Sequence, residues 1–147
     1  ADIADAAARI NAPLHLDKTY ACVEGPRLGT RAESFFLRDS AQSDLVGMTN
    51  VPEVFLAREA QLAYCTLCLV TDYDCWMDDP AEHVSVDKFF ATYQGTLTKA
   101  QAVLAELLKQ PFRPTPDEVR QSLAGAVLTP DAALTDAQKV WLDVLRA

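Results

Sequence analysis

Tyr64-Cys-Thr-Leu-Cys-Leu-Val-Thr71 is the stretch that decides the fold of this chain, because nearly every position is apolar or β-branched. Such a run is typical of a strand that is covered on both faces by other parts of the protein. Two shorter strand candidates precede it, at residues 19–24 and 44–48. The sequence therefore predicts three strands, of which the strand at residues 64–71 is the buried one.

Helical patterns alternate with these strands along the chain. Thr30-Arg-Ala-Glu33 has the spacing of a capping box, in which a hydroxyl and a carboxylate bond each other's backbone N–H groups at a helix start. From Ser85 to about Lys109, apolar residues recur every three or four positions and indicate a core or subunit contact. The expected helices span residues 2–11, 30–40, 53–63, 85–109, 117–125 and 135–146.

Strands separated by helices predict an α/β fold with a central parallel or mixed sheet flanked by helices. Three legible strands make a thin sheet for 147 residues, which fits half of a domain better than a whole one. The chain also opens with Ala1 instead of methionine, which suggests an excised piece. We therefore expect residues 1–147 to form one part of a larger domain.

The charge of the chain argues against a nucleic-acid binder. The 13 Lys and Arg residues against 21 Asp and Glu give a net charge of −8, and the arginines are scattered among acids. No apolar run approaches the roughly 20 residues that span a bilayer, and no secretory pattern is present. We expect a cytoplasmic protein that binds neither nucleic acid nor membrane.

Cys65 and Cys68 have a spacing that also occurs in zinc and redox sites. In the predicted strand, however, side chains three positions apart point to opposite faces, so the two thiols could not share one metal ion. The chain has no second pair at ligand spacing, and its histidines are His15 and His83. We expect no metal site and reduced cysteines.

The segments that follow the strands are the expected ligand-binding segments, because open α/β sheets bind ligands at the carboxyl ends of their strands. These segments span residues 24–30, 48–53 and 71–76. The last contains Asp72 and Asp74, which point the same way in an extended backbone. Two adjacent carboxylates resist both being charged, and burial adds to this effect, so one of them is expected to keep a proton.

A protonated acid beside a carboxylate is a donor–acceptor pair that matches one edge of a 6-aminopurine, whose N7 accepts and whose amino group donates. Donation to N7 would make the purine a better leaving group, which is general-acid catalysis worth typically 10²–10⁴-fold. On periodicity alone, the favoured alternative is a solvated acidic loop that also includes Asp78 and Asp79. Arg27 and Arg31 could bind an anion near a helix start, but pairing with Glu24 or Glu33 is the favoured interpretation.

Five blocks of sequence, taken together, resemble the consecutive blocks of 5′-methylthioadenosine phosphorylases, in the purine nucleoside phosphorylase family. Their order and spacing match over about residues 9–110, and several blocks in register are far more specific than any one alone. The blocks are Val23-Glu-Gly-Pro-Arg27, Thr30-Arg-Ala-Glu-Ser-Phe35, Gly47-Met-Thr-Asn-Val-Pro-Glu53, Leu56-Ala-Arg-Glu-Ala60 and Val70-Thr-Asp-Tyr-Asp-Cys-Trp76.

The resemblance implies phosphorolysis of 5′-methylthioadenosine to adenine and 5-methylthioribose-1-phosphate, with inorganic phosphate as co-substrate and no cofactor. It implies that Asp72 contacts N7 and the exocyclic amine and that Asp74 supports it at the same edge. The other implied contacts are Thr49 to phosphate, Met48 to the sugar, and Leu28 and Gly29 to the base.

The preference between purine bases rests on two positions. Relatives that act on 6-oxopurines resemble this chain but carry asparagine in place of Asp72 and glutamate in place of Gly29, so a 6-amino group is favoured here. Leu28 and Gly29 also depart from the aromatic residue and serine that methylthioadenosine phosphorylases usually carry. A phosphorylase for methylthioinosine, inosine or guanosine, or a nucleosidase that uses water, therefore stays open.

The resemblance further implies that the fold is the C-terminal half of the phosphorylase/hydrolase-like fold. The glycine-containing loop and the arginine–histidine pair that hold phosphate belong to an N-terminal half, and nothing in residues 1–147 matches them. We expect this chain alone to be inactive, and the full-length protein to be a homotrimer or to be completed by a separate N-terminal chain. A non-catalytic nucleoside-binding or assembly module stays open. An apolar helix face could serve a trimer contact, although covering the chain's own core is the default expectation; the face comprises Val140, Trp141, Val144 and Leu145.

Overall fold

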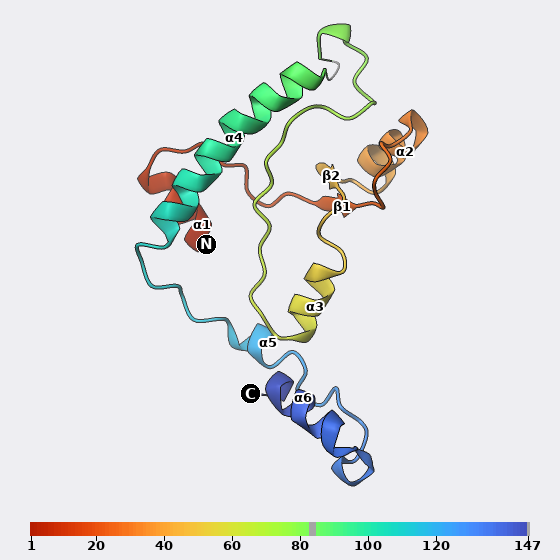
Figure 1. Cartoon of the computed structure of the whole chain (residues 1–147), viewed down its shortest axis with the longest axis vertical. Coiled ribbons are helices and arrows are strands. Elements are labelled where there is room, and N and C mark those ends of the chain that lie inside the picture. Colours follow the sequence, from red (N-terminus) through yellow and green to blue (C-terminus); the bar gives the residue numbers. More distant parts are fainter. Residues whose placement is uncertain (83–84, 147) are drawn as a thin grey trace. The chain divides into compact units, whose positions relative to one another are not determined.

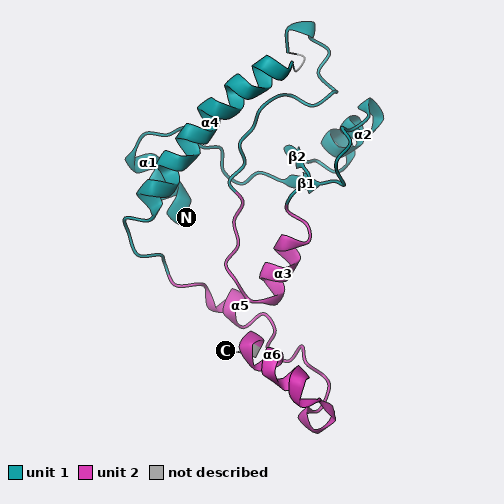
Figure 2. Ribbon diagram, in the orientation of Figure 1, with its two compact units in different colours: residues 1–49, 67–113 teal, residues 50–66, 114–147 magenta. Residues whose placement is uncertain are grey.

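The computed structural model describes residues 1–82 and 85–146, which form two compact units (Figure 1). The first unit comprises residues 1–49 and 67–113, and the second comprises residues 50–66 and 114–147 (Figure 2). His83 lies outside the described residues. Every residue that the sequence predicts at the substrate site belongs to the first unit.

The first unit has its core where helix α1 (Asp2–Arg9) packs against helix α4 (Val86–Leu107). Ala6 and Ala7 of α1 are buried against Val103 of α4. The small alanine side chains allow the two helix backbones to approach closely. Four partly buried residues surround this contact, namely Ile3, Ala12, Leu14 and Leu107.

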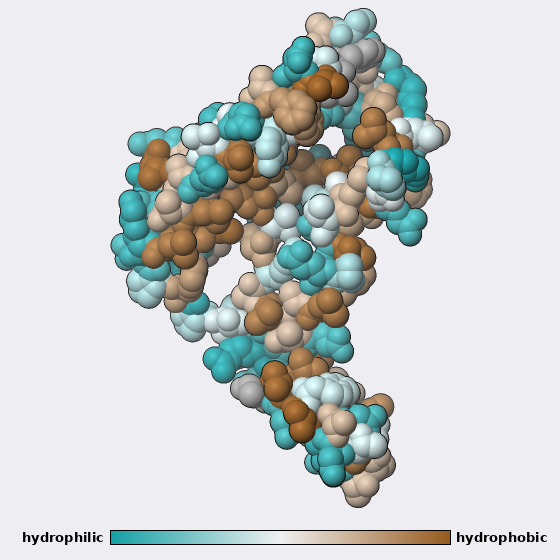
Figure 3. Space-filling model, in the orientation of Figure 1, coloured by the Kyte–Doolittle hydropathy of each residue, from teal (hydrophilic) through white to brown (hydrophobic). Residues whose placement is uncertain are grey.

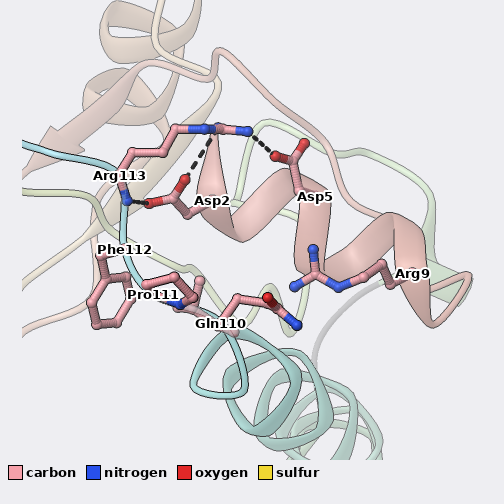
Figure 4. A pocket seen from close by; sticks show the side chains of 8 residues that line it. Asp2, Asp5, Arg9, Gln110, Pro111, Phe112 and Arg113 are labelled. Carbon is pink, nitrogen blue, oxygen red and sulfur yellow. Dashed lines mark hydrogen bonds and ion pairs between the residues drawn. The ribbon is translucent and has the colours of Figure 1, made fainter.

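Arg113 ties the chain that follows α4 to the first turn of α1 (Figure 4). Its backbone N–H donates to Asp2 Oδ2 at 3.2 Å, and its guanidinium forms ion pairs with Asp2, at 3.1 Å, and with Asp5. Carboxylates in a first turn also favour the helix, because they lie near the positive end of its dipole. The contact therefore fixes both the start of α1 and the course of residues 110–113.

The sheet has two parallel strands, β1 (Tyr20–Cys22) and β2 (Leu45–Gly47). Tyr20 lies opposite Leu45, and Cys22 lies opposite Gly47. Both strands were expected from the sequence and both are confirmed, with shorter bounds. The connection between them contains helix α2 (Arg31–Phe35), which continues as a π-helical turn, Phe36–Ser40.

The expectation of a third strand at residues 64–71 is wrong. The chain is irregular from residue 62 to residue 74, and Val70 is 51% exposed. Composition favours an extended conformation, but a strand also needs a neighbour that completes its hydrogen bonds. Among the described residues, β1 and β2 pair with each other and the sheet has no further strand. The reasoning about Cys65 and Cys68 that relied on this strand fails with it.

Helix α4 exposes much of the apolar stripe that the sequence predicts for it. Figure 3 shows hydrophobic residues on the surface along its course. The most exposed are Val86 at 70%, Phe90 at 56%, Leu104 at 43% and, just beyond the helix, Leu108 at 72%. The prediction that this stripe is buried in a core is therefore wrong at these positions, whereas Leu107 packs against the contact between α1 and α4. None of the described helices combines the length and apolar character needed to cross a membrane.

The second unit contains helices α3 (Glu53–Glu59), α5 (Asp117–Arg120) and α6 (Asp136–Arg146). Gln61 joins three of its segments, because its Nε2 donates to the carbonyl of Leu145 at 2.7 Å and its Oε1 accepts from the backbone N–H of Leu123 at 3.1 Å. On α6, Leu142 is buried. The expectation that the apolar face of α6 covers the chain's own core is wrong for three residues, Val140, Trp141 and Val144, which are 53–74% exposed.

Candidate functional site

The acidic pair lies at the end of the irregular segment, and its two carboxylates have different surroundings. The hydroxyl of Thr71 donates to Asp72 Oδ1 at 2.6 Å. The backbone N–H of Cys75 donates to Asp74 Oδ1 at 2.8 Å, and the Asp74 carbonyl accepts from the N–H of Met77 at 3.1 Å. Asp74 is thus held within a turn, whereas Asp72 is exposed. The burial that was expected to favour a shared proton is therefore absent at Asp72, and the shared proton stays a prediction.

A hollow in the first unit opens beside Asp72. Lys88, in the first turn of α4, donates from Nζ to the carbonyl of Ala81 at 2.9 Å and forms an ion pair with Glu82 at 3.4 Å. A fixed cation therefore shares this hollow with the Asp72 carboxylate. The residues that line it are Val70, Thr71, Asp72, Tyr73, Glu82, Lys88 and Thr92.

Arg31 anchors the acidic-pair loop, by which we mean residues 72–78, to the start of α2. Its Nη1 donates to the carbonyl of Cys75 at 3.0 Å, and its guanidinium forms an ion pair with Asp78 at 2.7 Å. The same guanidinium lies 4.8 Å from the centre of the Phe35 ring. One side chain therefore holds both the backbone and a carboxylate of the loop that carries the acidic pair. The prediction that Arg31 pairs with Glu24 or Glu33 is wrong.

Arg38 adds a second attachment between the α2 region and this loop. Its guanidinium lies 4.5 Å from the centre of the Trp76 ring and 5.2 Å from that of Phe35. The Trp76 ring also meets Tyr73 edge to face, with 5.8 Å between their centres. Cation–π stacking of this kind restrains both partners, so the ring of Trp76 fixes the far side of the acidic-pair loop.

The loop before α2 is stiffened by Glu33. Its carboxylate accepts two hydrogen bonds from the guanidinium of Arg27, at 2.7 and 2.9 Å, as the sequence predicts. It also accepts from the backbone N–H of Thr30 while the Thr30 hydroxyl accepts from the N–H of Glu33, which confirms the capping box. These bonds lower the pKa of Glu33 to about 2, with the Arg27 hydrogen bond as the largest cause. The Glu33 carboxylate in turn raises the pKa of Arg27.

Two contacts bring the expected ligand-binding segments together. A Cβ built on Gly25 would lie 2.9 Å from Met48 Sδ, so the Met48 side chain, just after β2, packs against the loop that follows β1. The thiol of Cys75 lies 3.9 Å from the carbonyl of Gly29, which joins that loop to the acidic-pair loop. The first contact needs a small residue, because a side chain at Gly25 would displace Met48. The structure therefore brings together three segments that the chain order had only suggested.

Leu28 and Thr49 are both exposed, and Leu28 is 83% exposed. Within the described part of the chain, no hydrogen bond joins Leu28, Met48 or Thr49 to either carboxylate of the acidic pair. No three His, Cys, Asp or Glu residues of the described ranges are grouped in a way that could hold a metal ion.

The sequence analysis missed the attachment of the loop by arginines. Arg31 and Arg38 lie seven positions apart and therefore on one face of a helical segment. An aromatic residue in the neighbouring loop, Trp76, and one between the two arginines, Phe35, complete the stack. That spacing is the signal that could have found the attachment. Lys88 carried no comparable signal, because a single lysine in a first helical turn is common.

The model of the phosphorylase superfamily matches residues 1–110, which is most of the chain. The chain belongs to the phosphorylase superfamily. The matched region of this superfamily member contains β1, β2, α4, all three ligand-binding segments and the acidic-pair loop.

Two relatives of this superfamily member are S-methyl-5′-thioadenosine phosphorylases. The protein of Thermosynechococcus vestitus is 42% identical over 99% of this chain and 51% of its own length. The protein of Geobacter sulfurreducens is 37% identical over 99% of this chain and 50% of its own length. The chain therefore spans about half the length of these relatives.

Solved structures show the same relationship. A methylthioadenosine phosphorylase from an antarctic soil metagenomic library is 36% identical, with a TM-score of 0.80, over 98% of this chain and 51% of that chain. The methylthioadenosine phosphorylase of Schistosoma mansoni in complex with adenine is 28% identical, with a TM-score of 0.62, over 98% of this chain and 49% of that chain. The small parallel sheet and its helices are thus part of the phosphorylase fold.

Proposed function

We propose that this chain supplies the purine- and sugar-binding half of a site that cleaves 5′-methylthioadenosine with phosphate, giving adenine and 5-methylthioribose-1-phosphate. The acidic-pair loop carries this proposal. It places an exposed carboxylate, Asp72, and a carboxylate held in a turn, Asp74, beside a hollow, and two arginines hold the loop in place. Relatives that match nearly all of this chain are named for methylthioadenosine, and one solved phosphorylase holds adenine.

Asp72 is the proposed catalytic group. Its carboxyl proton would be donated to N7 of the purine as the glycosidic bond breaks, which leaves the departing base neutral. The unprotonated oxygen would accept from the exocyclic amine, and Asp74 would support this arrangement at the same edge of the base. A proton delivered in the transition state is worth typically 10²–10⁴-fold in rate. We further propose that Asp72 keeps this proton only when the bound nucleoside excludes water from the hollow.

The remaining contacts are those that the resemblance implies for the neighbouring segments. Met48 would pack against the sugar, Thr49 would contact phosphate, and Leu28 with Gly29 would cover the base. Inorganic phosphate is the co-substrate in this proposal, and no cofactor or metal takes part. The exposure of Leu28 supports this assignment, because an exposed apolar side chain is available to contact a flat, apolar ring.

The other half of the domain completes the site in this proposal. That half would supply the phosphate-holding loop and would join a central mixed sheet, either from the same polypeptide or from a separate one. A homotrimer is the expected assembly of the full-length protein, in the cytoplasm. Residues 1–147 then form a partial nucleoside phosphorylase domain, and we expect them to be inactive alone.

The decisive experiment joins this chain to the part of the Thermosynechococcus vestitus relative that it does not span and measures phosphorolysis of methylthioadenosine. Asp72→Asn should lower kcat/KM by about 10²–10⁴-fold, because an amide cannot give N7 a carboxyl proton. Asp17→Asn is the matched control, since Asp17 is an exposed aspartate outside the site with a φ of 53°, which asparagine tolerates. Unchanged activity of the Asp72→Asn protein would overturn the mechanism.

The substrate series separates the alternatives that Leu28 and Gly29 leave open. Methylthioadenosine, methylthioinosine, inosine and guanosine are assayed with and without phosphate. Faster cleavage of the 6-oxopurines would replace the proposed substrate, and cleavage without phosphate would indicate a nucleosidase. Binding of nucleoside with no cleavage under either condition would favour a non-catalytic module.

A further inference from the structure

Cys75 is held at each of its three polar groups. Its backbone N–H donates to Asp74 Oδ1 at 2.8 Å, and its carbonyl accepts from Arg31 Nη1 at 3.0 Å. Its thiol lies 3.9 Å from the carbonyl of Gly29, one of the residues expected to cover the base. Only two backbone torsions separate the N–H of a residue from its carbonyl, so fixing the carbonyl restricts the direction of the N–H. Cys75 therefore links the Arg31 guanidinium to the Asp74 carboxylate.

The guanidinium of Arg31 is itself held in one orientation. It contacts both carboxylate oxygens of Asp78, from Nη1 to Oδ1 at 2.7 Å and from Nη2 to Oδ2 at 2.9 Å. It also lies 4.8 Å from the centre of the Phe35 ring. A planar guanidinium that contacts two carboxylate oxygens and an aromatic ring has a defined direction, which the ammonium group of a lysine lacks. Arg31 can therefore fix the position of the Cys75 carbonyl.

One oxygen of the Asp74 carboxylate is available to a ligand. Oδ1 accepts from the Cys75 N–H, whereas Oδ2 accepts no hydrogen bond from any described residue. An ionised carboxylate only accepts hydrogen bonds, so at the edge of a purine it favours a 6-amino group, which donates, over a 6-oxo group, which also accepts. The preference between the two kinds of base therefore depends on the direction of Oδ2, and the bond to Oδ1 limits how far the carboxylate can turn.

We propose that Arg31 is a positioning residue that sets the preference for a 6-amino base, because its bond to the Cys75 carbonyl holds the Asp74 carboxylate toward that edge of the purine. Arg31 does not touch the base; it acts through Cys75 on Asp74. A misplacement of about 1 Å in such a contact can cost about 10²-fold in rate. This inference rests on the proposed function, in which the acidic pair meets the edge of the purine that carries N7 and the 6-amino group.

The test uses this chain joined to the part of the Thermosynechococcus vestitus relative that it does not span. Arg31→Met should lower the ratio of kcat/KM for methylthioadenosine to kcat/KM for methylthioinosine by about tenfold or more, whereas a loss of stability alone would lower both values together. The Arg31 and Asp78 side chains are 48% and 79% exposed, so losing their ion pair should leave the fold intact, which circular dichroism checks. An unchanged ratio in a folded Arg31→Met protein would overturn the inference.

Further variants show whether Arg31 acts by position and through Asp74. Arg31→Lys keeps the charge but not the planar fork of donors, so the ratio should stay low. In an Asp74→Ala background, Arg31→Met should change the ratio by less than about twofold, because the group on which Arg31 acts is gone. Arg120→Met is the control, since Arg120 is exposed, lies beyond residues 1–110 and has no side-chain bond to a described residue. Full recovery with lysine, or an equal effect of Arg31→Met with and without Asp74, would contradict the inference.

Equilibrium binding separates this inference from the proposed function. Titration calorimetry with adenine and hypoxanthine gives the base preference of the joined protein and of its Arg31→Met variant without any cleavage. A protein that cleaves no nucleoside but prefers adenine, and loses that preference with Arg31→Met, would contradict the function and support the inference. An active protein whose preference survives Arg31→Met would do the reverse. A protein that binds neither base, or both equally, would overturn both.

Discussion

Gly47→Ala tests the contact that positions the end of β2, directly before Met48. A Cβ at this position would lie 2.7 Å from Cζ and 3.1 Å from Cε2 of the Tyr20 ring, whereas ordinary contacts begin at 3.4 Å. The Tyr20 side chain therefore crosses the space above Gly47, and glycine is required for close approach, not for an unusual backbone angle. The Tyr20 hydroxyl oxygen would lie closer still to this Cβ, so the added methyl group forces the ring to retreat by more than 0.7 Å, the difference between 3.4 and 2.7 Å.

The expected cost follows from two opposing effects. Overpacking of this kind costs about 1–3 kcal/mol. Replacing glycine also removes freedom from the unfolded chain, which returns about 0.5–1 kcal/mol. Because the Tyr20 ring is only half-buried and part of it can turn toward solvent, we expect a net loss of about 1–2 kcal/mol.

Hydrogen exchange at Val23 measures this loss locally, because the Val23 N–H donates to the Gly47 carbonyl at 2.9 Å. A loss of 1–2 kcal/mol corresponds to about 5–30-fold faster exchange. Gly95→Ala is the matched control: it lies within α4 with no atom within 4 Å of its added Cβ, so it should stabilise the helix by about 0.5–1 kcal/mol. In a Tyr20→Ala background, Gly47→Ala should no longer cost stability. An equal cost with and without the ring would refute the steric argument.

Three further predictions concern the same unit. Val103→Ala deletes two methyl groups from a side chain that is 4% exposed, so urea unfolding should show a loss of about 2 kcal/mol. The folded pKa of Glu33, about 2, lies below its ordinary value of 4.5, so its bond to Arg27 stabilises the fold fully above pH 4.5 and this stabilisation is lost as the pH falls toward 2. NMR titration of the Glu33 carboxyl should show a midpoint at about 2. A midpoint near 4.5 would contradict the pairing with Arg27. Arg31→Met keeps the aliphatic part of the side chain but removes its hydrogen bond and ion pair to the acidic-pair loop, so the Met77 amide should exchange several-fold faster. Unchanged exchange at Met77 would mean that Arg31 does not hold the loop.

The parts of the fold that depend on neighbouring residues could be predicted from the sequence. The capping box at Thr30 and Glu33 forms as its spacing predicts, because all of its hydrogen bonds lie within four residues. Helix α4 also begins beside its predicted start, with the Ser85 hydroxyl accepting from the Lys88 N–H at 3.2 Å. Helix ends were predicted too long, as at α3, because apolar periodicity continues past the point where the backbone stops being helical.

The strand at residues 64–71 could not be predicted in the same way. Its apolar and β-branched side chains favour an extended backbone. A strand also needs hydrogen bonds to a neighbouring strand, and the described residues provide no such neighbour for this segment. The prediction that the apolar face of α4 is buried is wrong for the same reason. Val86 and Phe90 occupy apolar positions of the helical pattern, yet both are exposed. Apolar composition therefore predicts a tendency to be buried, and does not identify the segment that covers a residue.

The two carboxylates of the candidate site also differ in how far contacts within the described residues position them. Contacts made within the described unit, such as the arginine attachment of Trp76, are in place, and they fix the turn that holds Asp74. Asp72, two residues earlier, lies in the irregular stretch of residues 62–74, and its side chain is exposed. Contacts among the described residues therefore hold Asp74 in a turn, whereas the Asp72 carboxylate accepts a hydrogen bond from the neighbouring Thr71 hydroxyl.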